Sequence, residues 1–214
     1  MEKLKEHKKT IIITSIITLL PIVIGLLLWD KLPNELATHF DGKGEPNGWS
    51  SKAFTVFGLP FFLLVCHLCC IAAACADPRK QQIGGKIFRL MLWICPCISV
   101  FATVTIYGYA LGWSQNTSTL GILLVGVIFI AIGNYLPKCR QNYTIGIKLP
   151  WTLHDEENWN HTHRFAGKLW ILGGACILLF AVFDFGSIMI APIVTIVMAL
   201  IPAVYSFIYY LKHK

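Results

Sequence analysis

Charged residues are scarce in this chain of 214 residues. Only 14% of the residues are Asp, Glu, Lys or Arg, while 56% are hydrophobic, and the mean hydropathy is +0.63. A soluble domain of this size normally carries about 25% charged residues. The apolar residues fall into runs nearly free of charge, each close to the roughly 20 residues that cross a bilayer core. We therefore predict a polytopic membrane protein.

The chain also lacks the sequence patterns of common catalytic sites. It contains no HExxH helix, no glycine-rich phosphate loop and no recognisable Ser-His-Asp set. Acidic and histidine side chains do gather between residues 154 and 163. On one helix, however, Glu157 and His161 would share a face from which His163 points away. We therefore predict that the protein is not an enzyme and holds neither a cofactor nor a metal.

Hydropathy places six spans, which we expect to be helices because backbone groups in lipid must be satisfied within the segment. The first span follows a basic start and could be taken for a signal peptide, but no small-residue cleavage pattern follows it, so we retain it. The predicted fold is thus all-α. The six spans cover about residues 10–29, 54–76, 87–111, 120–136, 168–184 and 188–211.

The Lys and Arg residues predict the orientation of the spans. Of the 18, all but Lys31, Lys43 and Lys52 fall on the side that carries both termini and the connection at 137–168. By the positive-inside rule this side is cytoplasmic. The net charge of +7 is therefore a topology signal, and we predict no direct binding of nucleic acid.

The connection at 30–53 is longer than a helix-to-helix loop requires, since such loops commonly need about 2–8 residues. It contains Gly42, Gly44 and Pro46, which are typical of tight turns. We predict an ordered extracellular loop after the first span. The run Asp41-x-Lys43-x-Glu45 places a cation at a ligand position of a calcium loop, so a structured turn is favoured over a metal site.

Cysteine and histidine occur inside the spans. None of the eight cysteines lies in the outer segments, where disulfides would be favoured. The run Cys66-His67-x-Cys69-Cys70 has ligand-like spacing on a helix face, although cysteine also packs as a small apolar residue. For His67 two interpretations stay open: a functional intramembrane residue, or a ring satisfied by a hydroxyl such as that of Thr103 or Thr105.

A long motif lies between the fourth and fifth spans. It reads Gly133-Asn134-Tyr-Leu-Pro-Lys-Cys-Arg-Gln-Asn142-Tyr-Thr-Ile-Gly146-Ile-Lys-Leu-Pro150-Trp151-Thr152-Leu, followed by Trp159, His163-Arg164 and Gly167-Lys168. This run resembles the SdpI family, bacterial membrane proteins whose type member gives immunity to a secreted sporulation-delay killing peptide. The outer connection is similar to DUF1648, a small domain of unknown function that often precedes it.

The resemblance implies an integral immunity protein or receptor in the bacterial plasma membrane. Its implied partners are a peptide toxin at the outer face, the lipid bilayer, and a DNA-binding autorepressor held at the cytoplasmic face. The motif residues matched on the cytoplasmic side are Asn134, Asn142, Gly146, Lys148, Pro150, Trp151, Thr152, Trp159, His163 and Arg164. Family members often carry Arg and Thr where this chain has Lys148 and Leu149, and Lys cannot make the two-pronged contact of Arg.

From the leading hypothesis of toxin recognition at the outer face, we predict contact by the turn-rich outer segment. The candidate residues are His39, Asp41, Gly42, Gly44, Pro46, Trp49 and Lys52.

The motif also predicts local structure without reference to the family. Thr152 and the acidic residues that follow it are typical of a helix start, so we expect a helix from about Asp155 that continues into span five. Trp151, Trp159 and Trp170 are expected at the membrane interface, and Asn134 is expected to bond across helices. The segment is either a simple surface connector or a cytoplasmic platform for a protein partner.

Two other functions remain as alternatives. A small peptide or ion transporter would depend on His67, and a metalloprotein would use Cys66, His67 and Cys69. Proton-coupled transporters normally place paired charges in their spans, and this pairing is absent here. We divide the chain into regions 1–76 (DUF1648-like), 77–119 (third span), 120–185 (SdpI-like) and 186–214 (sixth span and tail).

Overall fold

The structure is a computed structural model that describes residues 2–113, 116–183 and 187–213. The chain forms two compact units, one made of Met1–Cys75 with Phe88–Ser118 and the other of Ala76–Ile87 with Thr119–Lys214. In the described residues, six helices are long and apolar enough to cross a membrane. The predicted polytopic membrane protein is confirmed at this level.

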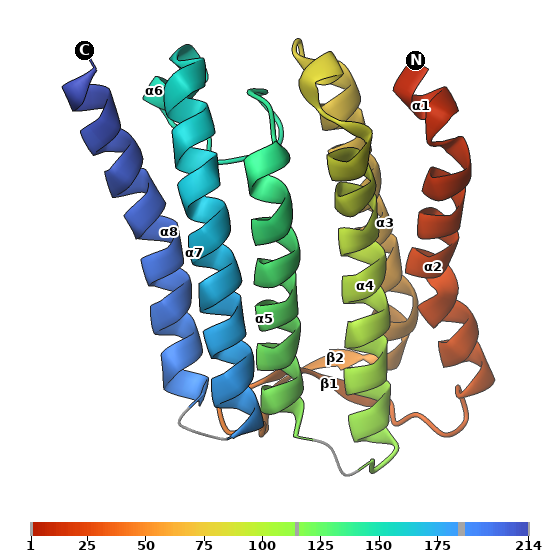
Figure 1. The fold of residues 1–214 in the computed structure, drawn as a ribbon. Coiled ribbons are helices and arrows are strands. Elements are labelled where there is room, and N and C mark those ends of the chain that lie inside the picture. The colour runs from red at the N-terminus through yellow and green to blue at the C-terminus, as the bar shows by residue number, and fades with distance from the viewer. Residues whose placement is uncertain (1, 114–115, 184–186, 214) are drawn as a thin grey trace. The chain divides into compact units, whose positions relative to one another are not determined.

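The first unit contains three of these helices, which Figure 1 labels α2, α3 and α4. A short α1 (Glu2–Glu6) leads into α2 (Lys8–Leu27), and a π-helical turn, η1 (Phe54–Gly58), runs directly into α3 (Leu59–Ala76). Most of α4 (Gly85–Ala110) completes the unit. Buried hydroxyls join α2 and α4, since Ser99 Oγ donates to the Thr18 carbonyl at 2.8 Å.

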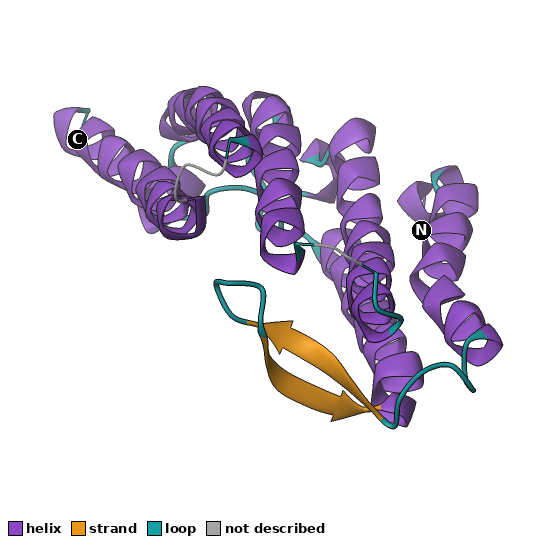
Figure 2. Cartoon of the chain, turned by 90° about the horizontal axis from the view of Figure 1, so that it is seen from below, coloured by secondary structure: helices purple, strands orange, loops and turns teal. Residues whose placement is uncertain are grey.

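The connection between α2 and η1 is a β-hairpin, so the fold is mostly helical rather than all-α. Strands β1 (Glu35–Phe40) and β2 (Pro46–Ser51) pair antiparallel, as Figure 2 shows. The register is irregular around Thr38, where Ala37 pairs with Trp49 and His39 with Gly48. The glycines and proline predicted turns, but the strands are too short and polar for a period-2 pattern to be seen in the sequence.

The second unit contains η2 (Lys80–Gln82), α5 (Thr117–Tyr135, from its third residue), η3 (Leu136–Lys138), α6 (Pro150–His154), α7 (Glu156–Val182) and α8 (Ser187–Lys212). Helices α5 and α7 approach closely through glycines. A Cβ on Gly126 would lie 3.1 Å from the Gly174 carbonyl oxygen, and one on Gly133 would lie 2.9 Å from that of Gly167. Small residues at these points let two backbones meet.

Helix α7 is longer than the predicted fifth span, which began at residue 168. Its first turns are polar and bury side chains such as Asn158 and His163 inside the unit. A hydropathy window therefore does not count these turns as part of a span. The predicted extension of the helix from about Asp155 is confirmed. The connection between the predicted fifth and sixth spans falls largely on residues 184–186, which lie outside the described residues.

Candidate functional site

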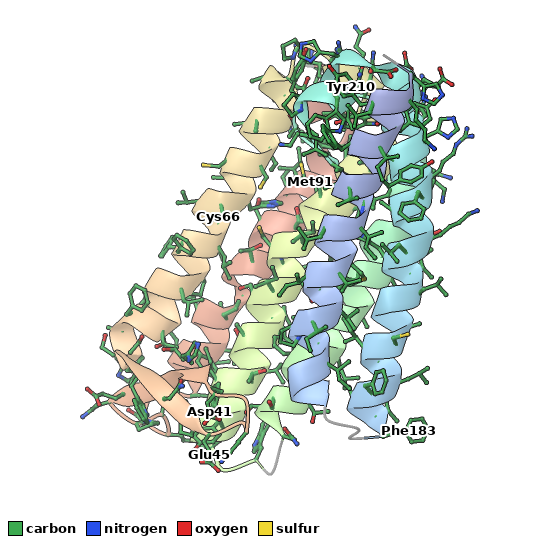
Figure 3. All side chains as sticks on the ribbon, turned by 90° about the vertical axis from the view of Figure 1, so that its left-hand side faces the viewer. Asp41, Glu45, Cys66, Met91, Phe183 and Tyr210 are labelled. Atoms are coloured by element: carbon green, nitrogen blue, oxygen red, sulfur yellow. The ribbon has the colours of Figure 1, made fainter. Side chains whose placement is uncertain are left out.

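The turn of the hairpin (residues 35–51) is formed by Asp41. Its carboxylate Oδ1 accepts hydrogen bonds from the N–H groups of Lys43 at 2.8 Å and Glu45 at 2.9 Å. Gly44 has a φ of +82°, which a residue without Cβ adopts at no steric cost. Figure 3 shows Asp41 and Glu45 together at the end of the hairpin. Asp41 and Gly44 therefore act within the turn.

The first residues of α5 hold this turn in place. Thr117 Oγ1 donates to the Gly44 carbonyl at 3.0 Å, and Ser118 Oγ donates to the Gly42 carbonyl at 2.8 Å. All four residues belong to the first unit. Two hydroxyls thus satisfy carbonyls that the strand ladder leaves free.

The inward side of the hairpin joins the core of the first unit. Leu32 and Leu36 are buried against Tyr107 and its neighbours on η1 and α4. Phe40 meets Tyr109 edge-on, with ring centroids 5.2 Å apart. The connection is therefore a packed part of the unit, in agreement with the ordered loop that the sequence predicts.

Among the remaining hairpin candidates, Lys52 is engaged in contacts within the unit, whereas Trp49 and His39 are exposed. Lys52 Nζ donates to the Trp29 carbonyl at 3.0 Å and lies over the Trp29 ring, so its charge is engaged within the unit. Trp49, by contrast, is 56% exposed. His39 is also exposed, and its Nδ1 contacts the Asn47 side chain.

The second group of candidates lies in the motif segment (residues 139–155), which is organised around Asn142. This side chain is fully buried. Its Oδ1 accepts from the N–H groups of Thr144 and Ile145 at 2.9 and 2.6 Å, while Nδ2 donates to the carbonyls of Arg140 and Ile145 at 2.8 and 2.9 Å. One amide therefore satisfies four backbone groups in a stretch without strand or helix.

Gly146, Trp159 and His163 form a tight contact behind this loop. The rings of Trp159 and His163 stack with centroids 4.0 Å apart. Gly146 has a φ of +127°, and a Cβ there would lie 2.6 Å from His163 Nε2 and 2.8 Å from the Trp159 ring. Only glycine fits between this backbone and the two rings.

The hydrogen bonds of His163 define its protonation. Nδ1 lies 2.8 Å from the Trp159 carbonyl, which can only accept, and Nε2 accepts from the Ile147 N–H at 2.9 Å. The ring is therefore neutral with its proton on Nδ1. A second proton on Nε2 would break the bond from Ile147.

The position of Trp159 differs from the one predicted from the sequence. It was expected at the membrane interface, but it is fully buried and its Nε1 donates to the Cys139 carbonyl at 2.7 Å. Burial raises the pKa of the Cys139 thiol to about 11, against a small lowering by the Asn142 hydrogen bond. The thiol is thus protonated and unreactive at neutral pH.

Thr152 and Trp151 extend the network along α6. Thr152 Oγ1 accepts from the Leu149 N–H at 2.9 Å, so it organises the start of α6 and not the start of α7, where Asp155 accepts from two backbone N–H groups. Trp151 Nε1 donates to Ser206 Oγ on α8 at 2.7 Å. Both side chains serve contacts within the unit.

Several buried hydrogen-bond partners were not predicted from the sequence. Asn158 Nδ2 donates to the Ser206 carbonyl at 3.0 Å, and Ser206 Oγ donates back to Asn158 Oδ1 at 2.8 Å. Arg79 donates to the Gln141 side chain. A single Ser within an apolar span gives little signal, because only packing decides whether it is buried.

Asp77 ties the connection between α3 and α4 to the motif segment. It is 4% exposed and accepts from the Arg79 N–H at 2.7 Å, the Tyr143 N–H at 2.9 Å and Thr144 Oγ1 at 2.6 Å. Burial alone would raise its pKa, but these hydrogen bonds outweigh it and hold the pKa below its ordinary value. The sequence feature that could have pointed to this role is a single acidic residue in an otherwise basic connection.

The other motif residues are exposed. Lys148 and Arg164 have exposed side chains, although Lys148 Nζ donates to the Thr144 carbonyl at 3.1 Å. Pro150 is exposed at the first position of α6, where its missing N–H costs nothing. Asn134 is also exposed, so the cross-helix bond predicted for it is not found among the described contacts.

His67 is buried in the first unit, and its contact differs from the two that were predicted. Its Nε2 lies 3.1 Å from Thr14 Oγ1 on α2, and that hydroxyl donates its own proton to the Thr10 carbonyl. Nε2 therefore carries the hydrogen and Thr14 accepts it. Thr103, one of the two predicted partners, donates to the Ser99 carbonyl instead. Among the described residues no three His, Cys, Asp or Glu side chains converge as a metal site.

These observations define the class of the protein: it is a multi-pass membrane protein with an ordered hairpin and a polar segment held by buried side chains. Residues 138–209 match the SdpI/YfhL protein family, and residues 16–64 match DUF1648, a domain of unknown function. The resemblance stated from the sequence is confirmed: the chain carries an SdpI-family segment together with the DUF1648 segment.

A curated relative matches over nearly the whole chain. The immunity protein SdpI of Bacillus subtilis (strain 168) is 28% identical over 201 residues, which cover 94% of this chain and 95% of the relative. No solved structure gives a significant match. At the level of the family, the likeness supports an immunity-protein role in the membrane.

Proposed function

We propose that this chain protects a bacterial cell from a secreted, membrane-active peptide toxin. The observation that carries the proposal is the similarity to an immunity protein over 94% of the chain, in a protein with six span-capable helices. The protein works as a binder in this proposal: it captures the toxin at the membrane and blocks its insertion.

The proposed orientation puts both termini and the motif segment in the cytoplasm and the hairpin outside. The distribution of Lys and Arg supports it, because positively charged connections are retained on the cytoplasmic side. Fusion of alkaline phosphatase within the hairpin should give an active enzyme, while a fusion after Lys212 should not. Activity of the second fusion with inactivity of the first would reverse the orientation.

In this orientation the toxin contact falls on the exposed part of the hairpin. Asp41, Gly44 and Lys52 are engaged within the unit, so we assign them to shaping the surface. Trp49 offers the large exposed ring that dominates many binding sites. His39 lies beside it in the strand register, opposite Gly48.

On the cytoplasmic side, the proposed second role is to hold a DNA-binding autorepressor once the toxin is bound. The exposed and charged motif side chains Lys148 and Arg164 are the proposed contacts, because the other polar motif residues, apart from the exposed and uncharged Asn134, are occupied inside the unit. Replacing Arg164 with Gln should abolish induction of a repressor-controlled reporter and leave survival unchanged. Loss of survival together with induction would argue against separate surfaces.

The central test is survival of a toxin-sensitive Gram-positive host that expresses the chain and is challenged with the sporulation-delay killing peptide. We expect survival with an intact membrane potential, and about tenfold weaker protection by Trp49→Ala, the scale of a binding hot spot. Trp113→Ala is the matched control, because Trp113 is 58% exposed and lies outside the hairpin. Death of cells that express the wild-type chain at full level would contradict the proposal.

A further inference from the structure

Among the described residues the hairpin is a sheet of only two strands, so each strand has one edge without a neighbouring strand (Figure 2). The two edges differ in exposure. In β1, Leu36 and Ala37 are buried, whereas β2 alternates between half-buried and exposed residues along its whole length. The edge of β2 is therefore the more accessible of the two.

The hydrogen bonds at the base of the hairpin determine which main-chain groups of β2 face this edge. The Lys52 N–H donates to the Asn34 carbonyl at 2.8 Å. The next three pairs along the ladder are Glu35 with Ser51, Leu36 with Ser50, and Ala37 with Trp49. In an antiparallel ladder hydrogen-bonded and non-hydrogen-bonded pairs alternate. Ser50 therefore bonds to β1, while the N–H and C=O groups of Trp49 and Ser51 point away from β1.

Most of these outward main-chain groups are available for a partner. The Ser51 carbonyl accepts from Thr55 Oγ1 at 3.1 Å. For the Ser51 N–H and for the N–H and C=O of Trp49, no hydrogen bond outside the ladder is described. Two donors and one acceptor thus lie along the edge of β2, and they repeat every second residue as the main-chain groups of a strand do.

The edge of β2 also lacks the charges that commonly protect an exposed strand. Natural edge strands carry lysine, proline or a bulge, which stops another chain from pairing with them. In this hairpin such protection is confined to the start of β2, where Pro46 lies and the register is irregular. No residue from Asn47 to Ser51 is charged. The half of the strand that holds Trp49 is therefore open to a third strand.

Trp49 adds a side-chain surface at the same edge. Leu36 packs into the core of the first unit, and its partner Ser50 shares that inner face of the sheet. Because successive side chains of a strand point to opposite faces, Trp49 lies on the outer face, where its ring is 56% exposed. A strand paired with β2 would place one of its side chains against this ring.

We propose that an extended segment of the peptide toxin binds as a third strand along the edge of β2, with main-chain hydrogen bonds to Trp49 and Ser51 and a side chain against the Trp49 ring. The assignment rests on the proposed function above. Strand addition takes its affinity from main-chain bonds, so it requires an extended backbone in the ligand and no particular charge. An edge without charges fits an apolar, membrane-active peptide better than a strongly charged one.

The first test is amide hydrogen exchange, measured by NMR on the isotope-labelled full chain in detergent. The N–H groups of Trp49 and Ser51 should exchange fast in the free protein and at least about tenfold more slowly once the killing peptide is added at saturation. The Ser50 N–H is the internal control, because it is bonded within the hairpin and should exchange slowly in both samples. Unchanged exchange of both edge amides would overturn the proposal. Slowing that follows protein concentration without peptide would assign the edge to a second copy of the chain instead.

The second test compares Ser51→Pro with Ser51→Ala in the toxin challenge. Proline removes an N–H that faces away from β1, a position where edge strands tolerate it. Alanine is the matched control, because it keeps the N–H and, like proline, lacks the hydroxyl that accepts from the Phe54 N–H at 3.3 Å. We expect protection about tenfold weaker for Ser51→Pro, the scale of one hydrogen bond, and wild-type protection for Ser51→Ala.

The outcomes separate strand addition from the proposed function. Equal protection by the two Ser51 variants, alongside weakened protection by Trp49→Ala, would exclude main-chain pairing and leave the proposed function intact. Failure of the wild-type chain to protect would contradict the proposed function itself, and the peptide as ligand with it. The exchange measurement uses the wild-type chain, so its result does not depend on the folding of either variant.

Discussion

The hairpin and the motif segment are two polar connections that satisfy their backbones in opposite ways. In the hairpin the strands bond to each other, which leaves side chains such as Trp49 free and exposed. The motif segment has no strand, and Asn142, Thr152 and His163 turn inward to bond its backbone. A polar residue in a membrane-protein loop is therefore available for a partner only when the backbone does not need it.

The largest expected effect is in the motif segment. Gly146→Ala places a Cβ against His163 and Trp159 and forces an L-residue to a φ of +127°. Strain at such a φ costs about 1–3 kcal/mol, and overpacking adds about 1–3 kcal/mol. We expect a strongly lowered unfolding temperature in detergent, which tryptophan fluorescence measures.

The matched control is Gly121→Ala on α5, where a Cβ meets nothing within 4 Å. Alanine there should leave stability unchanged or raise it slightly, because alanine favours a helix by about 1 kcal/mol over glycine. Equal effects of the two substitutions would show that Gly146 is not held by the two rings.

The second prediction concerns Asp77, whose hydrogen bonds hold its pKa below the ordinary value. The stabilisation is present above the unfolded-state pKa of about 3.9 and is lost as the pH falls through the folded-state pKa. Asp77→Asn should cost about 1–3 kcal/mol at pH 7, because an amide has only one acceptor oxygen, whereas the Arg79 N–H donates to one carboxylate oxygen and the Tyr143 N–H and Thr144 Oγ1 donate to the other.

The check is thermal unfolding of both proteins across acid pH. The difference in unfolding temperature between wild type and Asp77→Asn should become smaller as the pH falls below about 4. A gap that stays constant over this range would show that ionisation of Asp77 does not tie the two connections together.

A smaller effect is expected in the hairpin. Asp41→Ala removes the acceptor for two backbone N–H groups and should destabilise the turn by about 1 kcal/mol. Asp41→Asn keeps the acceptor and should behave like wild type. Limited proteolysis of the hairpin in detergent measures the difference. Equal cleavage of the three proteins would show that the strand ladder alone holds the turn.

The smallest effect should follow Lys148→Arg, which restores the residue more common in the family. The side chain is exposed and bonds only one carbonyl among the described contacts, and such surface changes stay within about 0.5 kcal/mol. Unfolding temperature should not change. A large shift would reveal a structural role for this position and would weaken the contrast between exposed and buried motif residues.

The helices and the motif segment differ in how far the sequence could predict them. Long apolar runs identify spans with little ambiguity, because crossing a bilayer imposes a length and a composition together. The start of α7 at Glu156 followed from the acidic residues after Asp155. The strands around Asp41 were missed, since a short polar hairpin carries no strong periodicity.

The order of apolar and polar residues along the sequence was enough to predict the membrane class, the six span-capable helices of the described residues and the ordered connection after the first of them. The tertiary structure decided which polar residues are free. It buried Trp159 behind Gly146, paired His67 with Thr14 and left the Tyr107 hydroxyl without a described partner. Such outcomes depend on which side chains from distant parts of the chain meet, and hydropathy and local spacing do not contain that information.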